Sequence, residues 1–306
     1  MNTWKKEMKN IKSTIAIMAI TVGFISAMDG NQKTENYGYH ETASSTNTEI
    51  TPKTTNEVNG ELTITLPVKQ TRNKVNKPFK EDKTTSSVKV KGIDHSAFDA
   101  LLTSYVSSSG KVDYQAIKDK VIILDKYLDY LSQNVPKSSA SKNEKLAFWI
   151  NAYNANTIKL LVDNYPVESI MDLHGGKVFD NKWLSIGDEK LSLNDIENNK
   201  IRAKFNEPRI HFAVNCAAKS CPPILNRAWT AVNIQAYLEA RAKTFINNSA
   251  YNKLSVGSVQ ISKIFEWYAK DFPEDIVSYL NKYSNTQIDA DAQVSYIEYD
   301  WTLNGK

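Results

Sequence analysis

The sequence contains only two cysteines in 306 residues, Cys216 and Cys221. Two thiols cannot form a disulfide framework, so a packed apolar core must hold the fold together. Hydrophobic residues make up 41% of the chain and aromatic residues 10%, which is typical of a globular domain. The close pair can still form a single disulfide in an oxidising compartment.

Several patterns that mark well-known sites are missing from the chain. No Gly-x-Gly-x-x-Gly or Walker pattern is present, so we expect no Gly-rich phosphate-binding loop. The absence of Gly-x-Ser-x-Gly argues against a serine hydrolase of that kind. A deaminase-type zinc site needs His-x-Glu before Cys-x-x-Cys, whereas the two cysteines here are five positions apart and a fourth ligand is missing. We therefore expect neither a metal nor another cofactor.

The charge distribution and the apolar runs exclude two further classes of partner. The formal charge is only +4, and Lys and Arg are dispersed rather than gathered in a block, so we expect no nucleic-acid partner. The apolar run Ile15–Ala27 has 13 residues. A helix that spans a bilayer needs about 20 apolar residues, so we expect no membrane span in the mature chain.

Residues 1–28 have the pattern of a signal peptide. A basic start with four lysines between Lys5 and Lys12 precedes the short apolar run, and a small residue, Ala27, stands at its end. A buried N-terminal helix is the alternative, but the polar sequence that follows gives it nothing to pack on. No cysteine follows the run to carry a lipid. We expect a secreted protein, either periplasmic or extracellular.

Residues 29–90 are rich in Thr, Asn, Lys, Ser and Glu, with few large apolar side chains. Such a segment cannot bury enough surface to offset the entropy lost on ordering, so we expect a disordered polar tether. Apolar periodicity begins at about Val88. The sequence therefore predicts one folded domain over residues 91–306.

Helical and strand patterns are mixed along this domain without regular alternation, which predicts an α+β fold, rich in helix, with a small antiparallel or mixed sheet. The expected helices cover residues 94–107, 117–135, 143–164, 194–204, 231–247, 261–270 and 274–283. The expected strands cover residues 183–186, 190–193, 209–215, 258–262 and 293–298.

The helix expected over residues 143–164 is apolar on most sides and should be central, yet it carries Asn151, Tyr153 and Asn154 in its middle. Asparagine is a poor residue for a helix interior, and a buried amide needs hydrogen-bond partners. The amides could form a structural network or line a pocket that binds substrate. We expect Asn151 or Asn154 to share one pocket with His211 and the loop that follows it.

The densest group of reactive side chains is His211, Cys216 and Cys221, with Glu197 upstream. A thiol nucleophile needs a base within hydrogen-bond reach, and the base needs an acceptor that orients it. A buried structural thiol, or a Cys216–Cys221 disulfide, is the competing interpretation.

The spacing limits which cysteine can meet His211. Five residues of extended strand cover about 16 Å and end on the opposite face, so a straight strand keeps His211 and Cys216 apart. A turn near Val214 or Asn215 would bring them together, and a loop that folds back would instead bring Cys221 to His211. On spacing alone, both cysteines remain candidate nucleophiles.

Four motifs resemble the family of domain of unknown function 547: Phe148–Ala155, Leu193–Glu197, Arg209–Pro222 and Tyr299–Asn304. The segments 101–106 and 110–114 are similar to the opening helices of that family. The family is grouped with papain-like cysteine peptidases and transglutaminases, so the resemblance implies a distantly similar fold.

The resemblance also implies a Cys-His-acid site at Cys216, His211 and Glu197, with Cys221 in the Ser-Cys-Pro element. It favours Cys216 as the nucleophile. The chain order of acid, histidine and cysteine is reversed from the papain pattern, so a shared site would require a rearranged connectivity.

The resulting hypothesis is an exported thiol-dependent hydrolase or acyltransferase that acts on a peptide-like amide, in cell-envelope material or a small thiol peptide. The cysteine would attack the carbonyl, His211 would transfer the proton, and Glu197 would orient the imidazole. Asn215 or a loop amide would bind the oxyanion. Ser220 completes the set of residues expected to bind substrate, with Asn151, Tyr153, Asn154 and Asn215.

The alternative is a non-catalytic module that binds envelope material or has a structural role. In the binding version, Trp183, Trp229 and Trp301 would line a groove for sugar or peptide. In the structural version, Cys216 and Cys221 would form a disulfide.

Overall fold

The computed structural model describes residues 92–272 and 275–305, so the predicted signal peptide and tether lie outside the described residues. The described elements are α2 (Ser96–Tyr105), α3 (Tyr114–Lys118), α4 (Val121–Gln133), α5 (Lys142–Asn164), η1 (Ile170–Gly176), β1 (Leu184–Ile186), β2 (Glu189–Leu191), η2 (Asp195–Arg202), α6 (Ala203–Phe205), η3 (Pro208–Phe212), α7 (Ile234–Ile246), β3 (Lys253–Leu254), β4 (Ser258–Ser262), α8 (Lys263–Trp267), η4 (Ala269–Asp271), α9 (Ile276–Asn281) and β5 (Gln293–Ile297).

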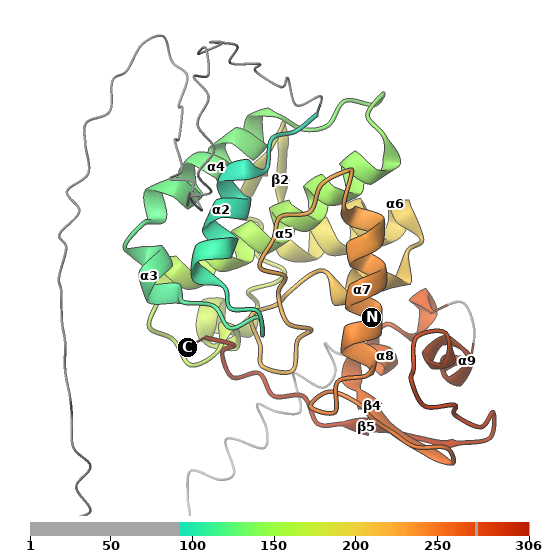
Figure 1. Cartoon of the computed structure of the whole chain (residues 1–306). Helices are drawn as coiled ribbons and strands as arrows, with labels where there is room; N and C mark the ends of the chain where they lie inside the picture. Colours follow the sequence, from blue (N-terminus) through green and yellow to red (C-terminus); the bar gives the residue numbers. More distant parts are fainter. Residues whose placement is uncertain (1–91, 273–274, 306) are drawn as a thin grey trace, which may run out of the picture. The chain divides into compact units, whose positions relative to one another are not determined.

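Helix α5 is the central helix of the domain, as the sequence predicts. Ser141 caps its start by accepting a hydrogen bond from the backbone N–H of Glu144 at 3.1 Å. The helix is buried almost continuously from Leu146 to Val162. It contacts α3 and α4 on one side and η2 and α7 on others, and Figure 1 shows these elements gathered around it.

The sheets are small, and the domain is an α+β fold rich in helix, as expected. Strands β1 and β2 form an antiparallel hairpin. Strand β4 pairs with β3 in antiparallel fashion and with β5 in parallel, so the three-stranded sheet is mixed. In the parallel pair, Ser258 lies opposite Gln293 and Ser262 lies opposite Ile297.

Two clusters of buried apolar side chains meet near His211. The larger cluster surrounds α5 and includes Ile210, whereas the smaller one includes Phe212 together with Phe245 of α7 and Phe265 of α8. Neighbouring residues of η3 thus belong to different clusters. His211 lies between them, and burial on both sides fixes its imidazole in place.

The strand predicted over residues 209–215 is wrong, because this segment begins with the short 3-10 helix η3. Pro208 stands in the first turn, where its fixed φ favours a helical start, and the side chain of Glu207 accepts the backbone N–H of Arg209. The segment is apolar on both sides because it lies between two clusters. Periodicity cannot distinguish such a short buried helix from an inner strand.

Two other local predictions need correction. The helix expected over residues 117–135 is divided into α3 and α4. The helix expected over residues 194–204 begins without a side-chain cap, because the Asn194 side chain makes no cap hydrogen bond and instead donates to Asp180 at 2.7 Å. The helix that follows Asn194 starts as a π-helix, η2, a rare geometry that is frequent at functional sites.

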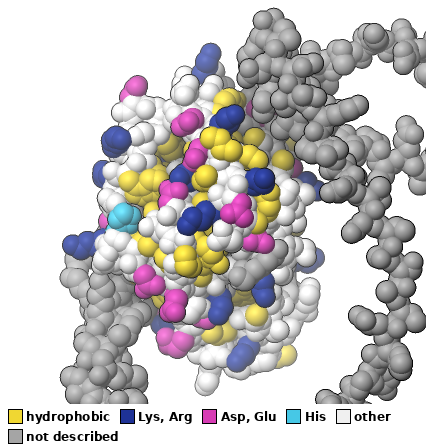
Figure 2. Space-filling model, turned by 90° about the vertical axis from the view of Figure 1, so that its left-hand side faces the viewer, with side chains coloured by type: hydrophobic (Ala, Val, Ile, Leu, Met, Phe, Trp, Pro, Cys, Tyr) yellow, Lys and Arg dark blue, Asp and Glu magenta, His cyan; other side chains and the backbone are white. Residues whose placement is uncertain are grey.

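The surface shown in Figure 2 carries Lys and Arg interspersed with Asp and Glu, with apolar side chains between them. Across residues 92–272 and 275–305, no helix combines the length and the apolar character needed to cross a bilayer.

Candidate active site

A cavity of about 50 Å³ brings several of the predicted reactive residues together. Its lining comprises Tyr153, Phe179, Asn194, Glu197, His211, Val214, Cys216, Cys221, Pro222, Ile264, Trp267, Tyr268, Tyr299 and Trp301. All four residues expected to be catalytic are in this lining, although they lie up to 24 positions apart in the sequence (197 to 221). In the described part of the chain, no group of three or more His, Cys, Asp or Glu side chains is arranged to hold a metal ion.

The loop that carries both cysteines is held in a strained shape. Ala217 has φ of +64°, in the left-handed region, which costs a residue with a Cβ about 1–2 kcal/mol. Asn215 offsets this cost, because its Oδ1 accepts the backbone N–H of Ala217 and its Nδ2 donates to the carbonyl of Pro222, both at 2.9 Å. The chain bends at Ala217, beyond the positions Val214 and Asn215 that the spacing left open for a turn, and Cys216 lies in the cavity lining.

The C-terminal segment pairs with this loop and completes the site. Lys219 donates its backbone N–H to the carbonyl of Thr302 at 2.8 Å, and Asn304 donates to the carbonyl of Ala217 at 2.9 Å. This pairing places the hydroxyl of Tyr299 3.1 Å from the sulfur of Cys216. A residue 83 positions away in the sequence is thus a direct partner of the thiol.

The two thiols have different environments. Cys216 is half-buried and Cys221 is buried, and both are free thiols. A hydrogen bond from the Cys221 thiol, aided by the Tyr299 hydroxyl and the backbone of Ala218, outweighs the effect of burial and lowers the pKa of Cys216. Burial raises the pKa of Cys221, and its proximity to Cys216 adds to the increase. Cys216 is therefore the thiol that ionises first and the more accessible one.

His211 is oriented by Asp271, which the sequence analysis missed. Its Nε2 lies 2.7 Å from Oδ2 of Asp271, and Arg202 donates to the same carboxylate, with Nη2 2.8 Å from Oδ1. Burial acts to raise the pKa of Asp271, but the hydrogen bonds and charges of His211 and Arg202 hold it well below its ordinary value. Tyr268 stacks on the imidazole with ring centroids 4.0 Å apart. Asp271 lies in η4, 60 positions after His211, so no local motif links them.

Glu197 has a different partner from the one predicted. It lies in the first turn of η2, is buried, and interacts with the hydroxyl of Tyr268. Burial, together with the charge of Glu197, raises the pKa of Tyr268 well above its ordinary value, so the phenol stays protonated and donates a hydrogen bond to the carboxylate. The prediction that Glu197 orients His211 is wrong in this geometry. Glu197 fixes Tyr268, and Tyr268 in turn covers the imidazole.

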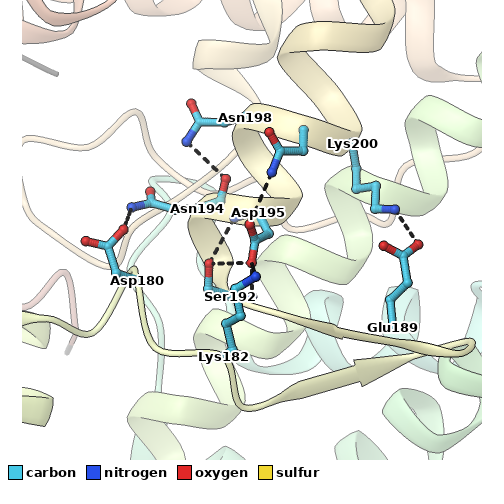
Figure 3. Close-up of polar contacts among 9 residues, drawn as sticks. Asp180, Lys182, Glu189, Ser192, Asn194, Asp195, Asn198 and Lys200 are labelled. Carbon is cyan, nitrogen blue, oxygen red and sulfur yellow. Dashed lines mark hydrogen bonds and ion pairs between the residues drawn. The ribbon is translucent and has the colours of Figure 1, made fainter. Parts of the chain in front are cut away.

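The start of η2 is anchored by a polar network that Figure 3 shows from Asp180 to Lys200. Asp195 accepts hydrogen bonds from the backbone and the hydroxyl of Ser192 and pairs with Lys182 at 3.3 Å. Lys200 pairs with Glu189 of β2. These contacts tie η2 to the β1–β2 hairpin and so hold Glu197 at the cavity.

His211 and the cysteines line one cavity but share no hydrogen bond among the described residues. Cys216 has Tyr299 and Cys221 as its polar partners, while His211 has Asp271. With Nε2 bonded to Asp271, the nitrogen left for proton transfer is Nδ1, which has no hydrogen-bond partner within the described chain. Catalytic contacts of this kind are often loose in the absence of substrate and tighten when it binds.

Aromatic side chains form the remaining walls of the cavity. Trp267, Tyr299 and Trp301 pack on one another, with ring centroids 4.7–6.0 Å apart. Phe179 adds a further contact to Trp301 at 6.3 Å. The indole N–H of Trp267 is buried and has no partner within the described residues. It is the unused hydrogen-bond donor of the cavity wall.

The asparagines of α5 hold backbone segments and do not line the cavity. Asn151 donates to the carbonyl of Trp229 at 2.7 Å and accepts its N–H at 3.0 Å. Asn154 donates to the carbonyl of Ala213 and accepts the N–H of Asn215, both at 2.9 Å. Asn154 thus lies beside the segment between His211 and Cys216, but it acts as a structural amide. Of the three residues expected on this helix, Tyr153 is the one that lines the cavity.

Three further residues of the expected sites have structural partners. Ser220 accepts the backbone N–H of Asp300 at 2.8 Å and is absent from the cavity lining. Asn215 is also outside the lining, and its side-chain amide holds the loop through Ala217 and Pro222, in contrast to the expected role at an oxyanion. Trp229 is 1% exposed, so it cannot line an open groove, in contrast to the expectation.

Comparison with known proteins gives one match. Residues 137–246 match the family described as Protein of unknown function, DUF547. No curated protein and no solved structure matches the chain. The matched segment contains α5, η2, η3, both cysteines and all of α7, whereas the Tyr299–Asn304 motif that completes the cavity lies beyond it. This match assigns residues 137–246 to the DUF547 family.

Proposed function

We propose that this protein is a thiol-dependent hydrolase or acyltransferase that acts on a peptide-like amide. One observation carries the proposal: a single cavity joins the half-buried, low-pKa thiol of Cys216 to His211, whose imidazole is held by a carboxylate. A nucleophile, a base and a group that orients the base are the parts that covalent catalysis requires. In this proposal the orienting group is Asp271 instead of Glu197.

The reaction runs in two halves. The Cys216 thiol gives its proton to Nδ1 of His211, and the thiolate attacks the amide carbonyl carbon to form a tetrahedral oxyanion. The C–N bond then breaks, the departing amine takes the proton from the imidazolium, and a thioester remains on Cys216. Water in a hydrolase, or an amine in an acyltransferase, loses a proton to His211 as it attacks the thioester carbonyl. The C–S bond then breaks, the acyl group leaves on the new nucleophile, and the Cys216 sulfur takes the proton back from His211.

The indole N–H of Trp267 is the donor that we assign to the oxyanion. It is buried in the cavity wall and has no other partner among the described residues. A donor held in place before the reaction, in a site with little water, stabilises developing negative charge most effectively. The side-chain amide of Asn215, in contrast, already has partners, because its hydrogen bonds maintain the loop.

The cavity favours a substrate that inserts a narrow group between aromatic faces. At about 50 Å³ it encloses the reacting carbonyl and a few neighbouring atoms, while the rest of the substrate stays outside. Tyr153, Trp301 and Phe179 contribute flat apolar faces that suit the planar amide.

The pattern of residues 1–28 supports a place of action outside the cytoplasm, on peptide-like or cell-envelope material. The basic start and the short apolar run are the grounds for this part of the proposal. Recovery of the protein in the periplasmic or culture fraction tests it, and retention in the cytosol after expression with residues 1–28 intact contradicts it.

Electrophilic peptide probes test the catalytic proposal. Wild-type protein should form a covalent adduct on Cys216, identified by peptide mass spectrometry, and Cys216→Ser should form none. Cys221→Ser is the matched control, because it removes a thiol of the same loop and should still be labelled, more slowly. His211→Asn should lower the labelling rate while circular dichroism shows an intact fold. Equal labelling of Cys216→Ser and wild type would contradict the assignment.

A binding module is the second candidate, and one observation favours it: no hydrogen bond joins His211 to either sulfur in the described chain. In that case the aromatic side chains that line the cavity would bind a ligand without catalysing a reaction. A structural module with a Cys216–Cys221 disulfide can be distinguished by measuring the mass of the protein with and without reductant. The disulfide lowers the mass by about two hydrogen masses, whereas the structure has two free thiols.

A further inference from the structure

Arg241 is a half-buried cation without a carboxylate partner among the described residues. It lies in α7, and its Nη2 donates a hydrogen bond to the carbonyl of Pro223, in the loop after Cys221. Its Nε is buried and has no partner among the described residues. Burial lowers the pKa of the guanidinium, but arginine stays charged in proteins. A buried charge that lacks a counterion is costly.

The other arginines of the domain show what is unusual about Arg241. Arg202, Arg209 and Arg227 each pair with at least one Asp or Glu. Within the described residues, the other arginines have carboxylate partners and Arg241 has none. Its buried Nε also lacks a hydrogen-bond acceptor.

Arg241 lines a second cavity, of about 400 Å³. Arg241, Lys111 and Lys219 contribute to its lining, which contains no Asp or Glu. Hydroxyl and amide donors complete it, from Ser108, Ser109, Thr244, Tyr251, Asn248 and Asn304. The two lysines are exposed, and Lys219 also lies within electrostatic range of Asp300, so the half-buried Arg241 is the least exposed of the three cations.

We propose that this cavity binds a phosphate group, as a phosphate monoester or as free phosphate. Three cations without a lining carboxylate match a ligand of charge about −2 better than a carboxylate of charge −1. The planar guanidinium also suits the oxygens of a phosphate, to which Nε and a terminal nitrogen can donate together. The volume leaves room for an organic group attached to the phosphate.

The site touches the cysteine loop, although it is separate from the proposed catalytic cavity. Cys221 belongs to the linings of both cavities, and Arg241 holds the carbonyl of Pro223, two residues further along. A phosphate on Arg241 would thus bind beside the loop that shapes Cys216. The inference does not depend on thiol chemistry.

Thermal denaturation of the full chain tests the site, with sodium chloride used to hold the ionic strength constant. Inorganic phosphate and glycerol phosphate should each raise the Tm in a saturable manner, and acetate should not. A larger rise with glycerol phosphate would identify a monoester as the preferred form, and a larger rise with inorganic phosphate would identify the free ion. An equal rise with acetate, or none with either phosphate compound, would overturn the proposal.

Arg241→Gln should abolish the phosphate-dependent rise. Lys243→Gln is the matched control, because it removes an exposed cation from the same helix and is outside the cavity lining. If Arg241→Gln fails to fold, the exposed pair Lys111→Gln and Lys219→Gln should weaken phosphate binding roughly tenfold or more, as expected for lost charged hydrogen bonds. Unchanged phosphate affinity in that double variant, or in a folded Arg241→Gln, would refute the site.

Discussion

The two buried asparagines of α5 allow a paired test of how the cysteine loop is held. Asn151 and Asn154 lie one turn apart, are 0% and 2% exposed, and each makes two hydrogen bonds to backbone groups. They differ in what they hold, because Asn151 binds Trp229, whereas Asn154 binds the segment between His211 and Cys216. Replacement of either one by leucine keeps a similar volume but removes both bonds.

The cost follows from the groups left behind. Each substitution strands one backbone N–H and one carbonyl, and an unpaired buried group costs about 1–3 kcal/mol. Asn151→Leu and Asn154→Leu should therefore each lower the free energy of unfolding by about 2–6 kcal/mol, a large part of the 5–15 kcal/mol typical of a domain. Urea denaturation followed by circular dichroism measures the loss.

The reactivity of Cys216 separates the two variants. Asn154→Leu should change the rate at which iodoacetamide alkylates Cys216, because Asn154 fixes the N–H of Asn215, the residue before the thiol. Asn151→Leu should leave that rate close to wild type. A loss of stability below about 0.5 kcal/mol in either variant would refute the reasoning about buried amides. Equal rate changes in both would refute the assignment of Asn154 to the loop.

Three further perturbations test other parts of the structure. Gly110→Ala should lower the Tm, because φ is +80° there and an added Cβ would lie 2.5 Å from Cβ of Pro223. Gly257→Ala is the control, because an added Cβ there meets open space and should leave the Tm unchanged or raise it. His95 is buried and its pKa is lowered to about 4, so stability should be full above pH 6.5 and fall by roughly 3 kcal/mol as pH drops towards 4. His95→Gln should flatten that profile, and an unchanged profile would contradict this. Asp271→Asn should lower the free energy of unfolding by roughly 1–3 kcal/mol in urea denaturation, since it leaves Arg202 without its carboxylate partner, and a near-zero change would contradict the pairing.

Elements of this fold with a clear apolar period are predictable from the sequence, whereas a short segment buried on both sides is not. Helices α5 and α7 and strands β4 and β5 lie close to their predicted ranges, because each has a sustained apolar pattern and clear boundaries. The segment containing His211 is too short for periodicity to decide, and burial on both sides gives a short helix the composition of an inner strand.

The candidate site was predictable only in part, for a related reason. His211, Cys216 and Cys221 are close in sequence and reactive, so they could be proposed from the chain alone. Asp271 and Tyr299 reach the cavity from elements 60 and 83 positions beyond their partners, through contacts that no local spacing encodes. The motif at Tyr299 was a usable signal, because its residues were part of the family resemblance although no role was assigned to them.

The pH dependence of Cys216 alkylation tests the central claim most directly. Native, reduced protein is treated with iodoacetamide across a pH series, and peptide mass spectrometry measures the rate at each cysteine. The account predicts that Cys216 reacts with a midpoint below the value of about 8.5 for a free cysteine, that Cys221→Ala raises this midpoint, and that Cys221 stays unreactive in the native fold. Resistance of Cys216 to alkylation, or a midpoint at or above about 8.5, would contradict its assignment as the nucleophile.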